Sequence, residues 1–369
     1  MIAAVCWTPF QIINTINYKI HYMPKTDMDI YICKNFWQAD NVAKRLSELK
    51  YIHHVYTVKK LDYDSIVAWK RKCSILKDLF LIENAIQDCL DETVDLKSKQ
   101  YTQIISSGYL NFNIYFNCYF KRKNAEIIFL DDGIETYLTA NTRSHYSAAY
   151  KFFSRLTQNG GTNLIADKWY VYAPELVVNR TRSQAVFPLK PLEHLSLPIK
   201  QDLNRVFGYE QQMLSSSFVY FDQIGTGDFS NGEELFEIQN HLLELLSNIC
   251  EIEHLLIKLH PRTLQTTYDN RYRILQTQVP WEVILLNEQT DNSVLLSLSS
   301  TACLTPKLIF DKEPWCIFLF KLFPVSGDEI ENLIQRIRAC YRNPQRILIP
   351  NNVEEFKQLL EEQPWRIAE

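Results

Sequence analysis

The chain has 369 residues, of which 46% are hydrophobic and 22% charged, and its formal net charge is −4. This is the composition of an ordinary globular protein that is long enough for two domains, each with its own core. The small acidic excess excludes a general nucleic-acid binder, which needs a basic face to neutralise phosphates.

The first half of the chain alternates short apolar segments, typical of strands, with longer segments of helical character. The expected strands are residues 2–6, 28–33, 54–58, 103–106, 126–130 and 168–172, the last being the final strand of this half. The expected helices are residues 9–20, 39–49, 65–89 and 111–120. Such an alternation indicates parallel βαβ units.

Residues 177–215 interrupt this alternation with prolines and weak periodicity, so we interpret them as a connection between domains 1–190 and 191–369. A second alternation follows. Its expected strands are 218–221, 255–259, 283–286, 294–296 and 315–320, and its expected helices are 230–250, 330–341 and 353–361, the first opened by a Ser230-to-Glu233 capping box. The predicted fold is α/β, with two Rossmann-like domains facing each other across a cleft.

Three short polar motifs each follow an apolar run that we expect to be a buried parallel strand. They are Asp131-Asp132-Gly133, Lys258-Leu259-His260-Pro261-Arg262 and Ser299-Ser300-Thr301. Open α/β sheets bind their ligands at the carboxyl ends of the strands. A carboxylate pair, a histidine and a hydroxyl pair placed there are suited to acid–base chemistry on a phosphate ester.

The acidic motif has three open interpretations. Asp131 could be a general base, because burial at a strand end raises the pKa of a carboxyl group. Asp132 and Gly133 could instead form an ordinary surface turn. The two carboxylates could also hold Mg²⁺ against a diphosphate.

His260 could neutralise a phosphate leaving group and protonate it, and Pro261 ends the strand beside it. Lys258 lies two residues earlier on the same face of the strand and could add a second contact. A histidine that caps a loop is the alternative.

Ser299 and Ser300 offer hydroxyl and N–H groups at an expected helix start, an arrangement that binds anions, although serine runs more often only cap helices. Gly225, in the segment Gly225-Thr226-Gly227, could also bring N–H groups to a phosphate. Position 230 is serine, so the third glycine of the dinucleotide fingerprint is missing, and we do not predict a nicotinamide site.

Together, in this order and spacing, the motifs resemble those of the bacterial sialyltransferases. The segment 258–262 resembles the family's K-x-H-P-R motif, and 280–284 resembles the segment whose glutamate, here Glu282, binds the ribose of a cytidine nucleotide. Residues 6–11 and 129–157 resemble glycosyltransferase family 52, the lipooligosaccharide sialyltransferases. The resemblance covers motifs and element order over most of the chain, not continuous identity.

The resemblance implies a fold of the GT-B type and an inverting transfer of sialic acid from CMP-sialic acid to a galactose-type acceptor, α-2,3-linked, on a bacterial lipooligosaccharide or capsule. It makes Asp131 the general base and His260 the group that acts on the phosphate. The implied donor-binding residues are Lys258, Pro261, Glu282, Ser299, Ser300 and Gly225. A monophosphate leaving group needs no metal, so no cofactor is expected. The alternatives are a UDP-hexose donor, a polysialyltransferase and a non-catalytic glycan- or nucleotide-binding protein.

Nine scattered cysteines without a C-x-x-C pair predict buried, reduced thiols and a cytoplasmic protein, and no signal peptide is expected. The basic clusters 70–72 and 121–123 fit a solvated surface better than peripheral contact with the inner face of an anionic membrane. Residues 144–156 and 177–215 are candidate contacts of a homodimer.

Overall fold

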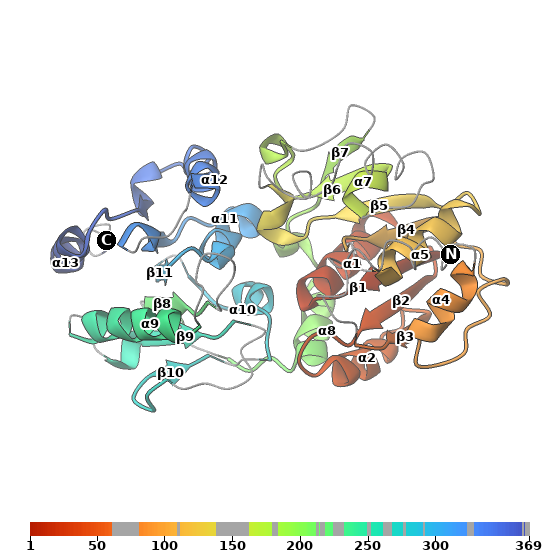
Figure 1. The fold of residues 1–369 in the computed structure, drawn as a ribbon, viewed down its shortest axis with the longest axis horizontal. Coiled ribbons are helices and arrows are strands. Elements are labelled where there is room, and N and C mark those ends of the chain that lie inside the picture. The colour runs from red at the N-terminus through yellow and green to blue at the C-terminus, as the bar shows by residue number, and fades with distance from the viewer. Residues whose placement is uncertain are drawn as a thin grey trace. The chain divides into compact units, whose positions relative to one another are not determined.

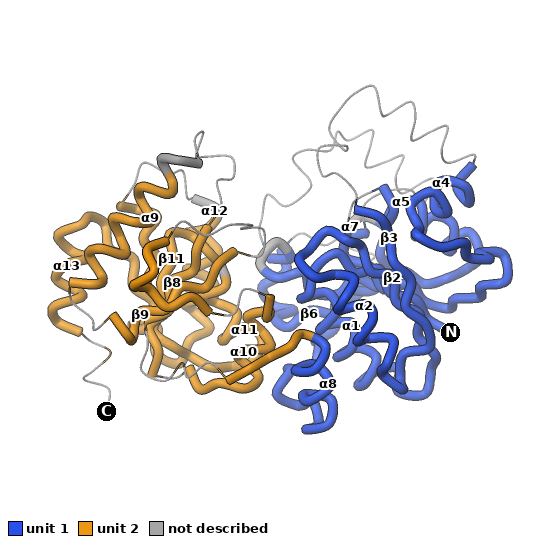
Figure 2. Tube along the Cα trace, turned by 90° about the horizontal axis from the view of Figure 1, so that it is seen from below, with its two compact units in different colours: residues 1–206 blue, residues 207–369 orange. Residues whose placement is uncertain are grey.

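The computed structural model divides into two compact units, Met1–Val206 and Phe207–Glu369, which are coloured separately in Figure 2. The structure describes residues 1–60, 81–108, 111–137, 162–178, 184–211, 214, 218–223, 232–248, 252–260, 268–275, 278–290, 292–322, 328–363 and 365. Helix α8 (Leu197–Phe207) falls almost wholly in unit 1, where the Arg45 guanidinium donates to the Val206 carbonyl at 3.1 Å. The division between the units therefore lies beyond the boundary expected after residue 190.

Unit 1 is built on a seven-stranded sheet in which every neighbouring pair of strands is parallel (Figure 1). Its spatial order is β3 (His54–Val58), β2 (Met28–Cys33), β1 (Ile2–Cys6), β4 (Gln103–Ser106), β5 (Glu126–Leu130), β6 (Lys168–Val171) and β7 (Ala185–Pro188). The described helices are α1 (Pro9–Tyr22), α2 (Ala39–Ser47), α4 (Ile82–Cys89), α5 (Asn111–Lys121) and α7 (Thr162–Ile165). Figure 2 shows α4 and α5 on one side of this sheet and α1 and α2 on the other.

The strands of unit 1 lie where the apolar runs predict them, with one exception. Lys168–Val171 is not the last strand, because β7 pairs with it in parallel inside the stretch that the sequence suggested was only a connection. β7 is an edge strand whose residues are largely exposed, so it carries no buried apolar run that the sequence could reveal. Pro188 fits there because an edge strand does not need every ladder N–H.

Unit 2 repeats the architecture with a six-stranded parallel sheet. Its spatial order is β10 (Arg273–Ile274), β9 (Leu255–Lys258), β8 (Phe218–Phe221), β11 (Val294–Ser297), β12 (Trp315–Phe318) and β13 (Ile347–Leu348). The described helices are α9 (Gly232–Ser247), α10 (Trp281–Asn287), α11 (Thr305–Phe310), α12 (Asp328–Arg338) and α13 (Val353–Glu362). The expected capping residue Ser230 lies outside the described residues.

The two faces of the unit 2 sheet have different partners. Alternate residues of β8, β9, β11 and β12 form one core with α9 and α13, which includes Tyr220, Ile257 and Leu243. The opposite face carries Phe221, whose ring packs edge-on against Trp281 of α10 at 4.9 Å between centroids. Lys258 alternates with Ile257, so it lies on the α10 face.

Residues 283–286 are not a strand, as the sequence suggested, but part of helix α10. Pro280 occupies the N-cap, and the buried residues Val283, Ile284 and Leu285 pack inward. A short, fully apolar run has no periodicity that separates a strand from a buried helical turn. The two-residue strands β10 and β13 and the short helix α11 were not predicted.

Both sheets have the doubly wound strand order, so the proposed α/β fold of two Rossmann-like units is confirmed. The order reverses between β1 and β4 in unit 1 and between β8 and β11 in unit 2. Ligands of such sheets bind at the carboxyl ends of the strands that flank this reversal. A ligand site is therefore expected in each unit at the carboxyl ends of these two strands.

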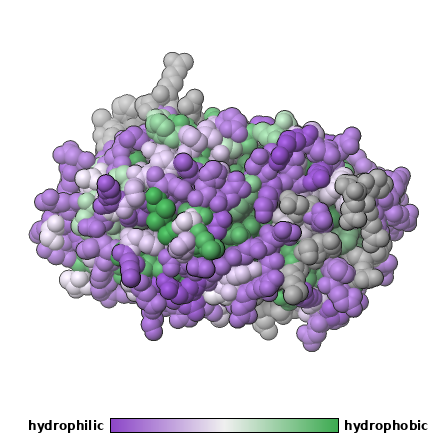
Figure 3. All heavy atoms as spheres, turned by 180° about the vertical axis from the view of Figure 1, so that it is seen from behind, coloured by the Kyte–Doolittle hydropathy of each residue, from purple (hydrophilic) through white to green (hydrophobic). Residues whose placement is uncertain are grey.

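None of the seven cysteines in the described part of the chain forms a disulfide. Five of them are buried, as predicted, whereas Cys89 is half-buried and Cys340 is exposed. In the same part of the chain, no helix combines the length and the apolar character needed to cross a membrane. Hydrophilic residues predominate on the face drawn in Figure 3, with apolar residues in small groups. In the basic cluster 121–123, Lys121 pairs with Asp167 at 2.7 Å and Lys123 donates to the Leu96 carbonyl at 3.0 Å, which favours a structural role for both lysines.

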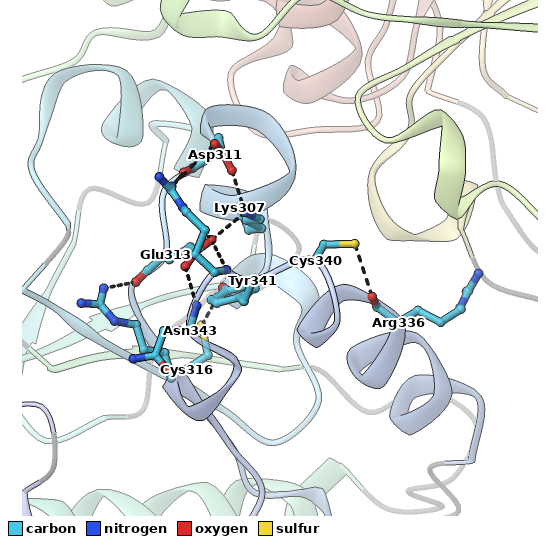
Figure 4. Close-up of polar contacts among 10 residues, drawn as sticks. Lys307, Asp311, Glu313, Cys316, Arg336, Cys340, Tyr341 and Asn343 are labelled. Carbon is cyan, nitrogen blue, oxygen red and sulfur yellow. Dashed lines mark hydrogen bonds and ion pairs between the residues drawn. The ribbon is translucent and has the colours of Figure 1, made fainter.

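Glu313, which precedes β12, links helix α11 to the segment that follows α12 (Figure 4). Its carboxylate accepts from Lys307 Nζ at 2.6 Å, from the Arg342 N–H at 2.8 Å and from the Asn343 N–H at 3.3 Å. The side chain is only 8% exposed. These contacts outweigh burial and lower the pKa of Glu313 to about 2.

We expect Glu313→Gln to lower the free energy of unfolding by about 2 kcal/mol at pH 7, because a buried ion-pair partner is lost. The folded-state pKa of Glu313 is depressed, so its contribution is present above the unfolded carboxyl pKa of about 4.3 and disappears as the pH falls toward 2. Urea denaturation at pH 7 and at pH 3 measures both values. The exposed Glu361→Gln is the control, and an equal loss at both pH values would contradict the ion-pair explanation.

Candidate active site

The first acid of the motif, Asp131, lies at the carboxyl end of β5 and is 1% exposed. Its Oδ1 accepts the Gly133 N–H at 2.9 Å, and its Oδ2 accepts the Tyr172 N–H at 3.0 Å and the Tyr137 hydroxyl. Burial raises the pKa of Asp131 to about 6, against the lowering effect of these hydrogen bonds. The carboxyl group is therefore buried and locally satisfied.

The backbone of Asp131 is held as firmly as its side chain. Its N–H donates to the Tyr170 carbonyl at 2.9 Å, and its carbonyl accepts from Asn14 Nδ2 at 2.8 Å. Asn14 in turn accepts from the Tyr172 hydroxyl at 2.7 Å. β5, β6 and α1 thus meet at this residue.

The second acid, Asp132, is half-buried and contacts a different element. Its Oδ1 accepts from Gln11 Nε2 at 2.7 Å, and its N–H donates to Thr136 Oγ1 at 2.9 Å. Gly133 follows with a φ of 76°, a left-handed conformation that favours glycine and turns the chain sharply after the acidic pair.

His260 follows β9 and is half-buried. Its backbone N–H donates to Asp222 Oδ2 at 3.2 Å. Asp222, which directly follows β8, is 6% exposed and also accepts from the Tyr268 hydroxyl at 2.7 Å through Oδ1. A single buried carboxylate therefore determines where the chain carrying His260 leaves the sheet.

Lys258 and Glu282 approach one another on the α10 face of unit 2. Lys258 is 7% exposed, and its Nζ donates to the Val279 carbonyl at 2.8 Å, just before α10. Burial lowers the pKa of Lys258 to about 8, opposed by the charge of Glu282. Burial likewise raises the pKa of Glu282 to about 6, opposed in part by Lys258.

Ser299 and Ser300 follow β11, the strand beside β8. Gln223, directly after Asp222, holds Ser299 from two sides: its Oε1 accepts the Ser299 N–H at 2.7 Å, and its Nε2 donates to Ser299 Oγ at 3.0 Å. Ser300 Oγ accepts the Ala302 N–H at 3.4 Å. A three-residue 3₁₀ helix, Thr301–Cys303, follows, and helix α11 begins at Thr305.

The structure brings four predicted donor-site residues, Lys258, His260, Glu282 and Ser299, to the carboxyl edge of one sheet. β9, β8 and β11 are adjacent there, and Trp281 Nε1 donates to the Ala302 carbonyl at 3.1 Å, which ties the start of α10 to the serine segment. Pro261 and Gly225 lie outside the described residues. Within the described part of the chain, no cluster of three or more potential metal-ligating residues occurs.

Sequence reasoning missed Asp222 and Gln223. Both are polar, and both follow the apolar run Phe218–Phe221, which is the same signal that identified the other three motifs. The prediction of a phosphate-binding segment after this strand was instead placed on Gly225-Thr226-Gly227, just beyond them. Gln11 was also missed as a partner of Asp132, although it lies in a segment, 6–11, that carries the family resemblance.

Three comparisons place this fold among known proteins. No protein-family model and no curated protein matches the chain.

Among solved structures, UDP-GlcNAc 2-epimerase of Methanocaldococcus jannaschii, in complex with UDP-GlcNAc and UDP, is similar to this chain. The TM-score is 0.52 at 15% identity, over 98% of this chain and 92% of the other. UGT89C1 of Arabidopsis thaliana, complexed with UDP-L-rhamnose, has a TM-score of 0.54 at 11% identity, over 100% and 91%. UGT2 of Phytolacca americana, complexed with UDP-2-fluoro-glucose and pterostilbene, has a TM-score of 0.51 at 11% identity, over 98% and 89%. At these identities the likeness shows the fold alone, and that fold is the GT-B type with two Rossmann-like domains.

Proposed function

We propose that this chain is an inverting, metal-independent sialyltransferase that moves sialic acid from CMP-sialic acid to a galactose-type acceptor of a bacterial surface glycan. The observation that carries the proposal is the arrangement of Lys258, His260, Glu282 and Ser299 at the carboxyl edge of the unit 2 sheet. The sequence alone predicts the same four residues as donor-site residues.

The donor side follows from the chemistry of these side chains. An imidazolium at His260 would neutralise the phosphate of CMP as it leaves and could protonate it. The hydroxyls of Ser299 and Ser300 would donate to phosphate oxygens, and Glu282 would accept from ribose hydroxyls. A monophosphate leaving group requires no more charge than these groups supply, which supports transfer without a metal.

The acceptor side is assigned to the acidic pair of unit 1, and the family resemblance gives the role of base to Asp131. The acceptor hydroxyl loses its proton to the base while its oxygen attacks the anomeric carbon, and CMP departs from the opposite face. One displacement of this kind inverts the configuration at that carbon. The nucleotide-linked β-sugar becomes an α-sialoside.

A UDP-hexose donor is the second candidate, and one observation favours it. The solved structures with this fold include proteins complexed with UDP-GlcNAc, UDP-L-rhamnose and UDP-2-fluoro-glucose. The midpoint of thermal unfolding separates the candidates, because at equal concentration the nucleotide that binds more tightly stabilises the folded state more. CMP should raise the midpoint more than UDP at equal concentration if the donor is CMP-sialic acid.

Release of CMP from CMP-sialic acid, with and without lactose, tests the proposed activity. We expect CMP release that lactose accelerates and a new α-sialoside in the product. The same assay with UDP-hexoses is run in parallel. Release of UDP with no release of CMP would overturn the proposed donor, and no transfer from either donor would overturn the proposed activity.

A further inference from the structure

We infer that Lys258 is a positioning residue of the donor site, which holds the start of α10 so that Glu282 can accept from the ribose hydroxyls. The inference rests on the proposed function, because it requires a nucleotide donor with a ribose. The ammonium group of Lys258 thereby acts through Glu282, in place of the second phosphate contact that the sequence suggested.

The ammonium group of Lys258 is directed at the segment that precedes α10. Lys258 is the last residue of β9, and it lies on the sheet face against which Trp281 of α10 packs. Its Nζ donates to the Val279 carbonyl at 2.8 Å, and Val279 is fully buried. Lys258 itself is only 7% exposed. A buried ammonium group costs free energy unless hydrogen bonds and an opposite charge compensate it, so the Val279 carbonyl and a nearby carboxylate help to keep it inside the protein.

The start of α10 depends on contacts from neighbouring elements, because its N-cap is a proline that makes no side-chain capping bond. Lys258 holds the Val279 carbonyl from the side of β9. Trp281 Nε1 donates to the Ala302 carbonyl at 3.1 Å, which holds the helix from the side of the serine segment. Glu282 is the next residue after Trp281, so these two hydrogen bonds place its backbone.

Lys258 and Glu282 also act on each other through their charges. Burial raises the pKa of Glu282 to about 6, and the ammonium group of Lys258 acts against this rise. A carboxyl group accepts hydrogen bonds through both oxygens in its ionised form, whereas protonation turns one oxygen into a donor. Lys258 therefore helps to keep Glu282 in the form that a pair of ribose hydroxyls requires.

A direct contact between Lys258 and a donor phosphate would disrupt this arrangement. The ammonium group would have to leave the Val279 carbonyl, and it would withdraw its positive charge from Glu282. His260 and Ser299, which follow β9 and β11, can bind the phosphate instead. The donor site then has a phosphate part and a ribose part, and Lys258 belongs to the ribose part.

The test measures which part of the nucleotide each variant still recognises. The ligands are CMP, 2′,3′-dideoxy-CMP, which lacks both ribose hydroxyls, and cytidine, which lacks the phosphate. Isothermal titration calorimetry with the full chain gives two ratios of Kd. The ratio of dideoxy-CMP to CMP measures ribose selectivity, and the ratio of cytidine to CMP measures phosphate selectivity. Both ratios compare ligands on one protein sample, so a fraction that fails to fold changes neither of them.

We expect the wild-type chain to prefer CMP over dideoxy-CMP by at least about tenfold, because hydrogen bonds to a charged group are lost with the hydroxyls. Lys258→Met, which keeps the length of the side chain without its charge, should lower this ribose selectivity by at least about fivefold and leave the phosphate selectivity within about twofold of wild type. Glu282→Gln should show the same pattern. Lys357→Met is the control, because Lys357 is an exposed residue of α13 in the same unit, and it should keep both ratios.

Loss of phosphate selectivity in Lys258→Met, or an unchanged ribose selectivity, would overturn the inference and leave the proposed function intact. A wild-type chain that binds UDP in place of CMP would overturn the proposed donor. The same two ratios, measured with UDP, dideoxy-UDP and uridine, would then decide the role of Lys258. A wild-type chain that binds none of these nucleotides would overturn the proposed function and the inference with it.

Discussion

Replacing His260 with alanine is expected to lower transfer by about 10²- to 10⁴-fold, the usual contribution of a positioned proton donor or acceptor. His260 stands at the end of β9, next to β8, whose end carries Asp222 and Gln223. The residue is half-buried. Steady-state rates with saturating donor separate loss of chemistry, which lowers kcat, from loss of binding, which raises KM.

His241→Ala is a matched control, because His241 is an exposed histidine of α9 in the same unit. It should retain wild-type rates. A His260→Ala variant with an unchanged kcat and only a raised KM would contradict its role in the departure of the phosphate. It would leave His260 as a binding residue.

Replacing Asp222 with alanine is expected to lower transfer by about 100-fold, although Asp222 is not one of the proposed donor-binding or catalytic residues. Its carboxylate holds the backbone N–H of His260 at 3.2 Å and the hydroxyl of Tyr268 at 2.7 Å. Without it, the chain that carries His260 loses its anchor, and a displacement of about 1 Å at a reacting group costs about 10²-fold. The free energy of unfolding should fall by about 2 kcal/mol or more, since buried donors are left unsatisfied.

The conservative variant Asp222→Asn separates positioning from general loss of stability. Its amide oxygen can still accept the His260 N–H, and its NH₂ group can donate to the Tyr268 hydroxyl. It should recover most of the transfer activity, and Tyr268→Phe should lose stability with little loss of rate. Equal inactivation of the alanine and asparagine variants, with equal thermal midpoints, would instead indicate that the charge of Asp222 acts in the reaction.

The fold was predictable because most strands are buried on both faces. Ile2–Cys6 and Leu255–Ile257 are buried at every position, and such runs appear in a sequence as uninterrupted apolar stretches. The errors in the predicted secondary structure also follow from burial and length. β7 is exposed, so it lacks an apolar run, and α10 is buried but too short to show a helical period.

The candidate donor site was predictable for a related reason. Parallel strands bring all their carboxyl ends to one edge, so residues that follow separate strands, such as His260 and Ser299, are placed together by topology alone. The residues that orient them are harder to recognise. Asp222 and Gln223 are identified only by contacts to residues 38 and 76 positions away.

The sequence by itself determined the α/β class, the repeated alternation of two Rossmann-like halves, and the kinds of side chain at each strand end, because these depend on local apolar patterns and on strand direction. Only the tertiary structure decided that Asp131 is buried and that the adjacent Asp132 is half-buried. Asp131 is enclosed by Tyr172, 41 positions away, and Asp132 is held by Gln11, 121 positions away. Neighbours in sequence take opposite environments when hydrogen bonds from distant elements satisfy one of them, and no local pattern records those contacts.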